Sequence, residues 1–338
     1  MVGMADYPRT VLEFNKRFHD DAACRAYLES IRWPEGPRCP RCSQAKIWKM
    51  KPPFYRCASC GHDFTATAGT LFADTHLPLC LWFQAMWFVV NQKNGTSALG
   101  IQRALVLGSY RTAWRWLHKL RRAMVRPGRD RLSGTVEVDE VYLGGERPGK
   151  RGRGAAGKAL VLIAAQVDGS KIGRIRLARV ANASAPVLAQ AIGAAVSPGS
   201  QVLTDGWKGY MTLKTKGYCH AVVRESAIVG ANLLPRANRV AALLQRWLMG
   251  THQGAVAAAH LDYYLDEFTF RFNRRTSASR GLLFYRLVEQ ALALSPVRGE
   301  SLVGGTQPQG MGSGENGANL TQIWDDFGEG ARASYGEV

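Results

Sequence analysis

Apolar residues recur at intervals of three and four positions along several stretches of the chain, which is the spacing of one helix face. In the first stretch Phe14 and Phe18 supply this spacing and Thr10 precedes it as an N-cap, so a helix is predicted over residues 10–30, within an N-terminal helical segment of residues 1–32. The same spacing predicts that residues 75–127 are helical throughout, and that further helices span residues 185–196, 235–249, 258–272 and 280–294.

Short apolar runs without helical spacing fill much of the region after residue 130. They are bounded by glycine, proline or polar residues, as strands commonly are. Because these runs surround one helix and are followed by long helices, they predict an α/β domain over residues 132–294. The predicted strands are residues 135–143, 159–167, 172–180, 201–204 and 220–223.

The charge of the chain points to a polyanionic partner. Lysine and arginine number 44 against 26 acidic residues, which gives a net charge of +18. Residues 298–338 hold two arginines and six acidic residues, so residues 1–297 carry +22. An excess of this size is typical of proteins that bind nucleic acid.

The N-terminus predicts no secretory signal, because residues 1–14 mix charged residues and proline without a continuous apolar core. The longest apolar run, residues 77–90, is interrupted by Gln84 and is too short to span a bilayer. We therefore expect a cytoplasmic, nucleoid-associated protein with no membrane partner.

Four cysteines form two CxxC pairs with 14 residues between them. Such pairs offer four thiolates to one tetrahedral Zn²⁺, which predicts a zinc ribbon over residues 33–66. Its site has no open coordination position, so the metal is structural. The alternatives are two unrelated reduced pairs or a redox CxxC motif. The predicted ligands are Cys39, Cys42, Cys57 and Cys60.

A helix-turn-helix is predicted within residues 75–127. Thr96 and Ser97 precede a helix that runs to about Leu105, and a short turn leads into a second helix over residues 110–124. That helix carries a basic stripe at helical spacing, which indicates contact with DNA. An ordinary solvated face is the alternative. The predicted DNA-binding residues of the stripe are Arg111, Arg115, His118 and Arg122.

Two aspartates end predicted strands. Asp139 lies in the alternating run of residues 135–143, on the same face as Glu137, and Asp205 follows the run of residues 201–204. Carboxylates at the ends of adjacent strands can share Mg²⁺ and support phosphoryl transfer. Asp205 in an Asp-Gly pair also fits a simple turn cap.

A third metal ligand is expected from a helix packed on these strands. Asn238 lies in the predicted helix 235–249, and Gln245 lies two turns later on the same face, with Arg246 beside it as a DNA-binding candidate. Glu267 on the following helix is the rival ligand.

Two further segments are predicted to be irregular. Residues 147–158 hold three arginines and two lysines and read as a basic loop between strands, available to phosphates. Residues 299–338 are glycine-rich with little periodicity, which is typical of a disordered tail.

Three longer motifs carry a resemblance to a known family: DEVYLGG at 139–145, LTDGWKGY at 203–210 and YLDEFTFRFNRR at 264–275. With the preceding ribbon and helix-turn-helix, they resemble the DDE transposases of bacterial insertion sequences, in particular the zinc-ribbon group whose third active-site residue is often Asn. The resemblance covers roughly residues 10–290. It implies an RNase H-like catalytic domain with Asp139, Asp205 and Asn238 as its active-site residues. Family members often carry Lys where this chain has Gln245.

The combined prediction is a DNA transposase that binds the terminal inverted repeats of its element and catalyses strand cleavage and transfer into target DNA. Zn²⁺ is expected as a structural ion and Mg²⁺, or Mn²⁺ in its place, as the catalytic ion. The resemblance also implies a homodimer or higher assembly in the synaptic complex. A catalytically inactive DNA-binding derivative, such as a repressor of the element, and another nuclease on the same fold remain alternatives.

Overall fold

The computed structural model describes residues 6–126, 128–144, 158–223, 232–254, 256–297 and 302. The chain divides into two compact units, of which the first joins the residues up to Arg126 with the segment that begins at Ser277. The second unit begins at Pro127 and holds the chain as far as Thr276. The predicted basic loop 147–158 and the predicted tail 299–338 lie outside the described residues, apart from Lys158 and Leu302.

The first unit contains more and shorter helices than the sequence predicts. The single helix expected over residues 10–30 is wrong, because the side chain of Asp20 accepts a hydrogen bond from the backbone N–H of Ala23 at 2.7 Å and starts a second helix. The region 75–127 is helical as predicted and contains three helices, and the expected turn between the helix that ends near Leu105 and the helix over residues 110–124 is confirmed. The helices of this unit are α1 (Val11–Arg17), α2 (Asp21–Arg32), α3 (Leu79–Asn91), α4 (Ala98–Ala104), α5 (Tyr110–Ala123) and α9 (Arg280–Ala293).

Phe284 of α9 lies at the centre of the aromatic core of this unit. Its ring is fully buried, with centroids 5.4 Å from that of Phe14, 5.5 Å from that of Phe83 and 5.8 Å from that of Trp87. Helix α9 therefore belongs to the first unit, and the predicted domain of residues 132–294 is wrong at its C-terminal end. Among the residues that the structure describes, no helix is long and apolar enough to cross a membrane.

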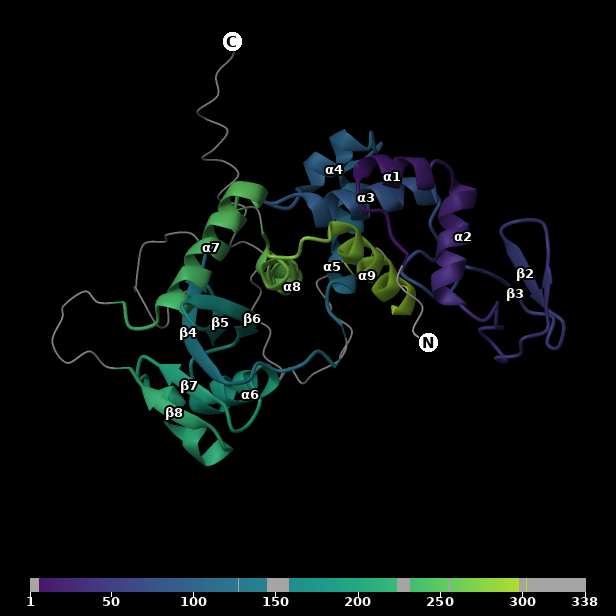
Figure 1. Cartoon of the computed structure of the whole chain (residues 1–338). Coiled ribbons are helices and arrows are strands. Elements are labelled where there is room, and N and C mark those ends of the chain that lie inside the picture. The colour runs from purple at the N-terminus through teal and green to yellow at the C-terminus, as the bar shows by residue number, and fades with distance from the viewer. Residues whose placement is uncertain are drawn as a thin grey trace, which may run out of the picture. The chain divides into compact units, whose positions relative to one another are not determined.

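A small antiparallel sheet lies between α2 and α3 in the chain (Figure 1). Its order is β1-β2-β3, and β2 and β3 flank the second cysteine pair. Strand β1 is not predicted from the sequence. The bounds are β1 (Ile47–Lys49), β2 (Phe54–Cys57) and β3 (Asp63–Thr65).

The second unit is a mixed five-stranded sheet with the order β6-β5-β4-β7-β8. Strands β4, β5 and β6 pair antiparallel, whereas β7 and β8 run parallel to β4. The strands match the predicted runs to within one residue at each end. They are β4 (Thr135–Leu143), β5 (Ala159–Asp168), β6 (Lys171–Val180), β7 (Gln201–Thr204) and β8 (Cys219–Val222).

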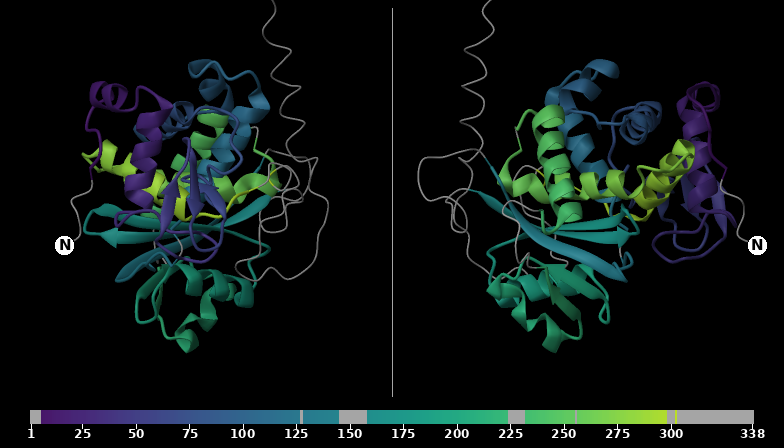
Figure 2. Two further views of the ribbon diagram at one scale, coloured as in Figure 1. Left: turned by 90° about the vertical axis from the view of Figure 1, so that its right-hand side faces the viewer. Right: turned by 60° about the vertical axis from the view of Figure 1, so that its left-hand side comes forward.

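Helices cover both faces of this sheet. Helix α6 and the 3₁₀-helix η1 pack on one face, against Val136 and Val138 of β4. Helices α7 and α8 pack on the other, where Val161 and Ile163 of β5 point (Figure 2). The predicted α/β architecture is thus confirmed. The bounds are α6 (Ala185–Ala195), η1 (Lys208–Lys216), α7 (Pro235–His252), η2 (Ala258–His260) and α8 (Leu261–Asn273).

Candidate functional site

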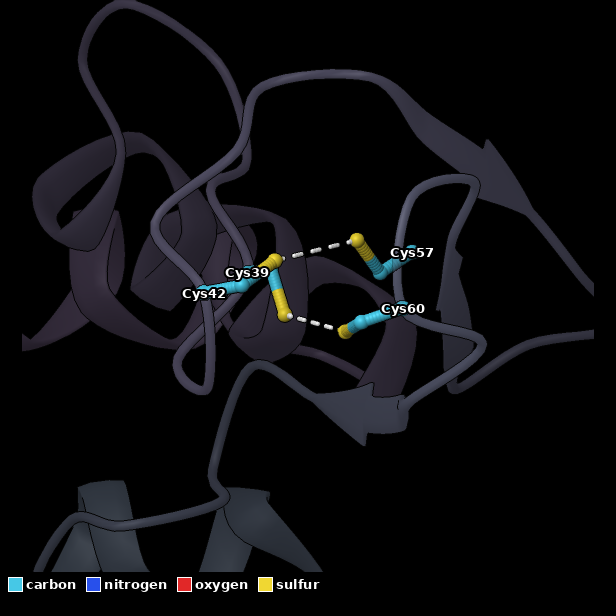
Figure 3. A group of neighbouring side chains, drawn as sticks. All are labelled: Cys39, Cys42, Cys57 and Cys60. Carbon is cyan, nitrogen blue, oxygen red and sulfur yellow. Dashed lines mark hydrogen bonds between the residues drawn. The ribbon is translucent and has the colours of Figure 1, made fainter.

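The four cysteines of the ribbon converge on one point (Figure 3). Their sulfur atoms all lie within 4.8 Å of one another, with Cys39 Sγ 3.7 Å from Cys60 Sγ and Cys42 Sγ 3.5 Å from Cys57 Sγ. Tetrahedral Zn²⁺ with Zn–S bonds of about 2.3 Å requires sulfur separations of about 3.8 Å. The residues present therefore fit a zinc ion, as the sequence predicts.

The local structure also favours the thiolate at Cys57, because hydrogen bonding from the backbone of Cys60 lowers the pKa of Cys57 to about 6. Besides the cysteines, the core under the ribbon sheet is built mainly from Tyr55, Phe64 and Trp33. A core of this size does not hold three short strands together without a metal.

The two predicted catalytic aspartates lie on neighbouring parallel strands. Glu137 of β4 pairs with Leu203 of β7, so the same register places Asp139 opposite Asp205, which directly follows β7. Adjacent strands lie about 4.8 Å apart. Because side chains alternate along a strand, both aspartates face the side of the sheet that α7 covers, as Leu203 does.

Backbone hydrogen bonds orient both carboxylates. The N–H of Glu140 donates to Asp139 Oδ1 at 2.8 Å, and the N–H of Trp207 donates to Asp205 Oδ1 at 2.9 Å. The turn after Asp205 requires a left-handed residue, and Gly206 occupies it with φ of 88°.

The rest of the LTDGWKGY motif anchors this turn. The indole of Trp207 donates to the carbonyl oxygen of Ala183 at 2.8 Å, and a Cβ atom at Gly209 would lie 2.7 Å from that same oxygen. The hydroxyl of Tyr210 donates to the Glu140 carboxylate, and burial raises the pKa of Tyr210, so the phenol keeps its proton. The motif thus links the strand that carries Asp139 to the turn that carries Asp205.

A buried carboxylate holds the first turn of α7 against β4. Glu137 is 2% exposed, and its Oε2 accepts the backbone N–H groups of Arg236 and Ala237 at 2.7 and 3.0 Å. The Arg236 guanidinium donates to Glu137 Oε1 at 2.9 Å, and also to the carbonyl oxygens of Gly169 and Lys171 in the turn between β5 and β6. The sequence places Glu137 on the face of Asp139 but does not reveal this contact.

Helix α7 runs in the same direction as β4. Its first turn meets Glu137, and farther along it Gln245 lines a cavity of about 220 Å³ together with Leu143 at the end of β4. Asn238 lies about 3 Å beyond Arg236 along the helix. Asn238 thus lies in the first turn of α7, next to Ala237, whose N–H donates to Glu137; its side chain is exposed, and its amide nitrogen donates to Asn232.

The rival ligand Glu267 lies elsewhere. It is on α8, which packs on β6, and β5 separates β6 from β4. Its side chain is 1% exposed and forms an ion pair of 2.8 Å with Arg271. Glu267 is thus part of a buried salt bridge and is not brought to Asp205.

The apolar residues on one face of α5 and at its C-terminal end are all buried; they are Ala113, Leu117, Leu120 and Met124. The predicted basic stripe is wrong at one position, because His118 is fully buried. Its ring lies against that of Trp114, with centroids 4.0 Å apart and planes tilted by 51°, and its Nε2 lies 3.3 Å from Arg121 Nη1.

The other basic positions differ in exposure. Arg111 is exposed, whereas Arg115 and Arg122 are partly buried. Arg246 is exposed on α7. Ser97 is the N-cap of α4, and its side chain accepts a hydrogen bond from the backbone N–H of Gly100. Ser109 caps α5 in the same way and accepts a hydrogen bond from the N–H of Thr112.

Two comparisons with known domains identify the class of protein. Residues 131–273 match the model of the ISXO2-like transposase domain, and residues 19–63 match the model of a transposase zinc-ribbon domain. Residues 131–273 are thus similar to an ISXO2-like transposase domain, and a transposase-type zinc ribbon precedes them. Together the two matches support an insertion-sequence transposase of this family.

A curated relative comes from Halobacterium salinarum and is described as an uncharacterized protein in transposable element ISH50. It is 28% identical to this chain over 142 residues. The match covers 41% of this chain and 46% of the relative, so this chain spans less than half the length of the relative that it matches.

The ribbon geometry predicts one Zn²⁺ per chain. Replacing Cys39 or Cys57 with Ser should remove the ion and unfold the ribbon, because three ligands and a small core do not suffice. Cys219→Ser is the matched control, since Cys219 is exposed and outside the ribbon. Elemental analysis of the purified proteins measures the zinc. A wild-type protein free of zinc, with the four thiols paired as disulfides, would contradict the prediction.

The contact of Glu137 with α7 predicts a large effect on stability. Glu137→Ala leaves Arg236 without its buried partner and should reduce the free energy of unfolding of the second unit by about 3–5 kcal/mol. Glu137→Gln keeps the shape of the side chain and should reduce the free energy of unfolding by less. Urea unfolding measures the stability, and amide hydrogen exchange at Arg236 and Ala237 reports the local contact.

Glu289→Ala is the control, since it removes an exposed ion pair with Arg286 and should change stability by about 1 kcal/mol or less. Unchanged exchange at both amides in Glu137→Ala would show that the Glu137 side chain does not hold the helix.

Proposed function

We propose that this chain cuts and joins DNA at the ends of its own insertion sequence, using an RNase H-like catalytic domain with Asp139, Asp205 and Asn238 at its active site. The observation that carries the proposal is the register of β4 and β7, which sets the two aspartates opposite each other beside the first turn of α7. The sheet of three antiparallel strands extended by two parallel ones fits the proposed fold.

The donor set suits Mg²⁺. Asp139 and Asp205 would hold the ion through carboxylate oxygens, and Asn238 would contribute an amide oxygen, all hard ligands of the kind that Mg²⁺ prefers. When bound between such carboxylates, Mg²⁺ activates a water or hydroxyl nucleophile and stabilises the charge on the leaving oxygen.

The protein's own part in this chemistry is orientation. The N–H group of Glu140 fixes one oxygen of Asp139, and the N–H group of Trp207 fixes one oxygen of Asp205. Because the two side chains are already held, they lose little conformational entropy when the ion binds. The Glu137 contact fixes the helix that carries Asn238. These contacts hold the three side chains near the arrangement that metal and substrate need.

DNA recognition is assigned to the first unit. We propose that the zinc ribbon and the α4–α5 helix-turn-helix bind the terminal inverted repeats, with Arg111, Arg115 and Arg122 on phosphates or base edges. Arg246 is proposed to contact DNA near the catalytic site. The family resemblance implies that two or more chains act together on the paired ends.

Gln245 favours a second candidate function. It stands where family members often carry a lysine that can bind phosphate, and it is exposed on α7. A chain without this cation could bind the repeats tightly and cut poorly, which would make it a repressor of its own element.

Asp139→Asn or Asp205→Asn should abolish strand cleavage while leaving repeat binding unchanged, because the substitution removes a metal ligand from the second unit only. Asn238→Ala should reduce cleavage without abolishing it, since the amide is a neutral ligand. The measurement is cleavage of a labelled duplex carrying the end of the element, in Mg²⁺ and in Mn²⁺.

Glu267→Gln is the control for the third ligand. It should lower stability, because it breaks a buried ion pair, but at a temperature where the protein stays folded it should cut as wild type does. Loss of cutting in Glu267→Gln and full cutting in Asn238→Ala would show that Glu267 is the ligand.

Gln245→Lys should increase cleavage, because it restores a cation that can bind phosphate. A wild-type protein that binds the repeat but never cuts it in either metal would favour the repressor.

The exposure of the α5 side chains predicts different effects of substitutions along the helix. Arg111→Ala should reduce the slope of log K against log salt by about 0.9 if the guanidinium neutralises one phosphate. His118→Gln should leave that slope unchanged and lower stability, because the imidazole is buried. Binding of a labelled duplex over a range of salt concentrations measures both. Equal slopes for wild type and Arg111→Ala would remove Arg111 from the DNA contact.

A further inference from the structure

A cavity of about 220 Å³ lies between the end of β4 and the second half of α7, and we call it the α7 cavity. The side chains of Leu143, Leu248 and Val256 belong to the buried core of this unit, so its floor is apolar. Met249 is 53% exposed and Gln245 is exposed as well, which places both at its mouth. An apolar cavity of about 150 Å³ is large enough for benzene, so this one is large enough for the ring of a nucleobase.

The α7 cavity lies on the same face of the sheet as the two proposed catalytic aspartates. Leu143 follows Asp139 by four residues in β4, so its side chain points to the same face about 13 Å farther along the strand. A DNA strand advances about 3.4 Å per nucleotide when its bases are stacked, and farther when it is extended. A strand with a phosphate at the aspartates therefore reaches the cavity with a base roughly two to four nucleotides away.

One exposed stripe of α7 leads from the proposed active site to the cavity. Its residues recur at intervals of four, three and four positions and are Asn238, Ala242, Gln245 and Met249. Arg239 and Arg246 are exposed beside this stripe. Helix α7 is described over its whole length, and it contains three arginines and no acidic residue. The stripe is therefore bordered by positive charge that no acid of the helix cancels, which suits a phosphate backbone.

We propose that the α7 cavity takes one unpaired nucleobase of the DNA strand whose phosphate lies at Asp139 and Asp205, while Arg239 and Arg246 contact the phosphates between them. The apolar walls would cover the faces of the base. The Gln245 amide both donates and accepts hydrogen bonds, as the edge of a base does.

An apolar side chain from a second copy of this chain is a poorer occupant. The copies would bring the exposed arginines of two α7 helices together, and like charges across a contact are unfavourable. An apolar side chain would also cover the Gln245 amide without offering it a hydrogen bond. The inference rests on the proposed function and names a base contact made beside the cleaved phosphate.

A mismatch at one position of the DNA should tighten binding, because the base is then already unpaired. The probes are element-end duplexes in which one mismatched pair is moved along both sides of the cleavage point, and a target duplex with the same series. Fluorescence anisotropy measures binding without divalent metal, so that no strand is cut. The Kd should fall about 10-fold for a mismatch roughly two to four nucleotides from the cleaved phosphate. The series that shows this gain identifies the strand that supplies the base.

Filling the α7 cavity should remove the gain. Met249→Trp places an indole at the mouth of the cavity and should bind paired and mismatched duplexes with equal Kd. The matched control is Met211→Trp, since Met211 is 59% exposed on η1, which packs on the other face of the sheet. This control should keep the full gain. Urea unfolding checks that both variants are folded.

Two further measurements test the contact with the base itself. The fluorescent base 2-aminopurine, placed at the position of the gain, should become brighter when the wild-type protein binds, because it leaves its stack. The wild-type protein should also prefer one base at that position. Gln245→Leu should keep the gain but lose this preference, since the amide contacts the edge of the base.

The proposal is overturned if no mismatch tightens binding by the wild-type protein, or if mismatches at every position do so equally, which would show only a preference for flexible DNA. It is also overturned if a folded Met249→Trp keeps the gain. A wild-type protein that binds no element-end duplex would instead contradict the proposed function itself.

Discussion

The carboxylate of Glu137 and the first turn of α7 form the contact on which the proposed catalytic arrangement depends. The backbone N–H groups at a helix N-terminus lack partners within the helix, and here a buried carboxylate accepts two of them. The same carboxylate pairs with Arg236, which also donates to two carbonyl oxygens after β5. One buried charge thus joins the strand of Asp139, the helix of Asn238 and the β5–β6 turn. A hydrophobic contact would bring α7 to the sheet, but it would not fix the helix along its own axis to within one residue.

The elements of the second unit are predictable from the sequence because their signals are local. Strands buried in the middle of a sheet appear as short apolar runs, and the five predicted runs correspond to β4–β8. The ribbon cysteines are likewise found from their spacing, since two tight turns bring each pair together. Strand β1 escapes prediction because two of its three residues are exposed, which leaves no apolar pattern. The interruption of the first helix at Asp20 depends on a single side-chain cap, which outweighs the apolar spacing on either side.

Contacts between distant residues are not predictable in this way. The spacing of α9 shows that one face is buried, but it does not show that Phe284 packs on Phe14 and Phe83. The basic stripe of α5 has helical periodicity, yet His118 is covered and Arg111 is not. Glu137 and Arg236 are 99 residues apart, so no local pattern relates them. The aspartates are the exception among distant residues. Asp205 directly follows one apolar run and Asp139 lies inside another, and the parallel pairing of these neighbouring strands brings the two side chains opposite each other.

Among the described residues, the second unit is an insertion within the first, because α9 belongs to the first unit. The chain leaves the first unit at Arg126 and returns to it at Ser277 to supply the central ring of its aromatic core. The stability of the proposed DNA-binding unit therefore depends on residues that follow the proposed catalytic domain in the chain. Cutting the chain after α8 would leave Phe14, Phe83 and Trp87 without the ring that they surround, so the core of the first unit depends on a helix that lies beyond the proposed catalytic residues.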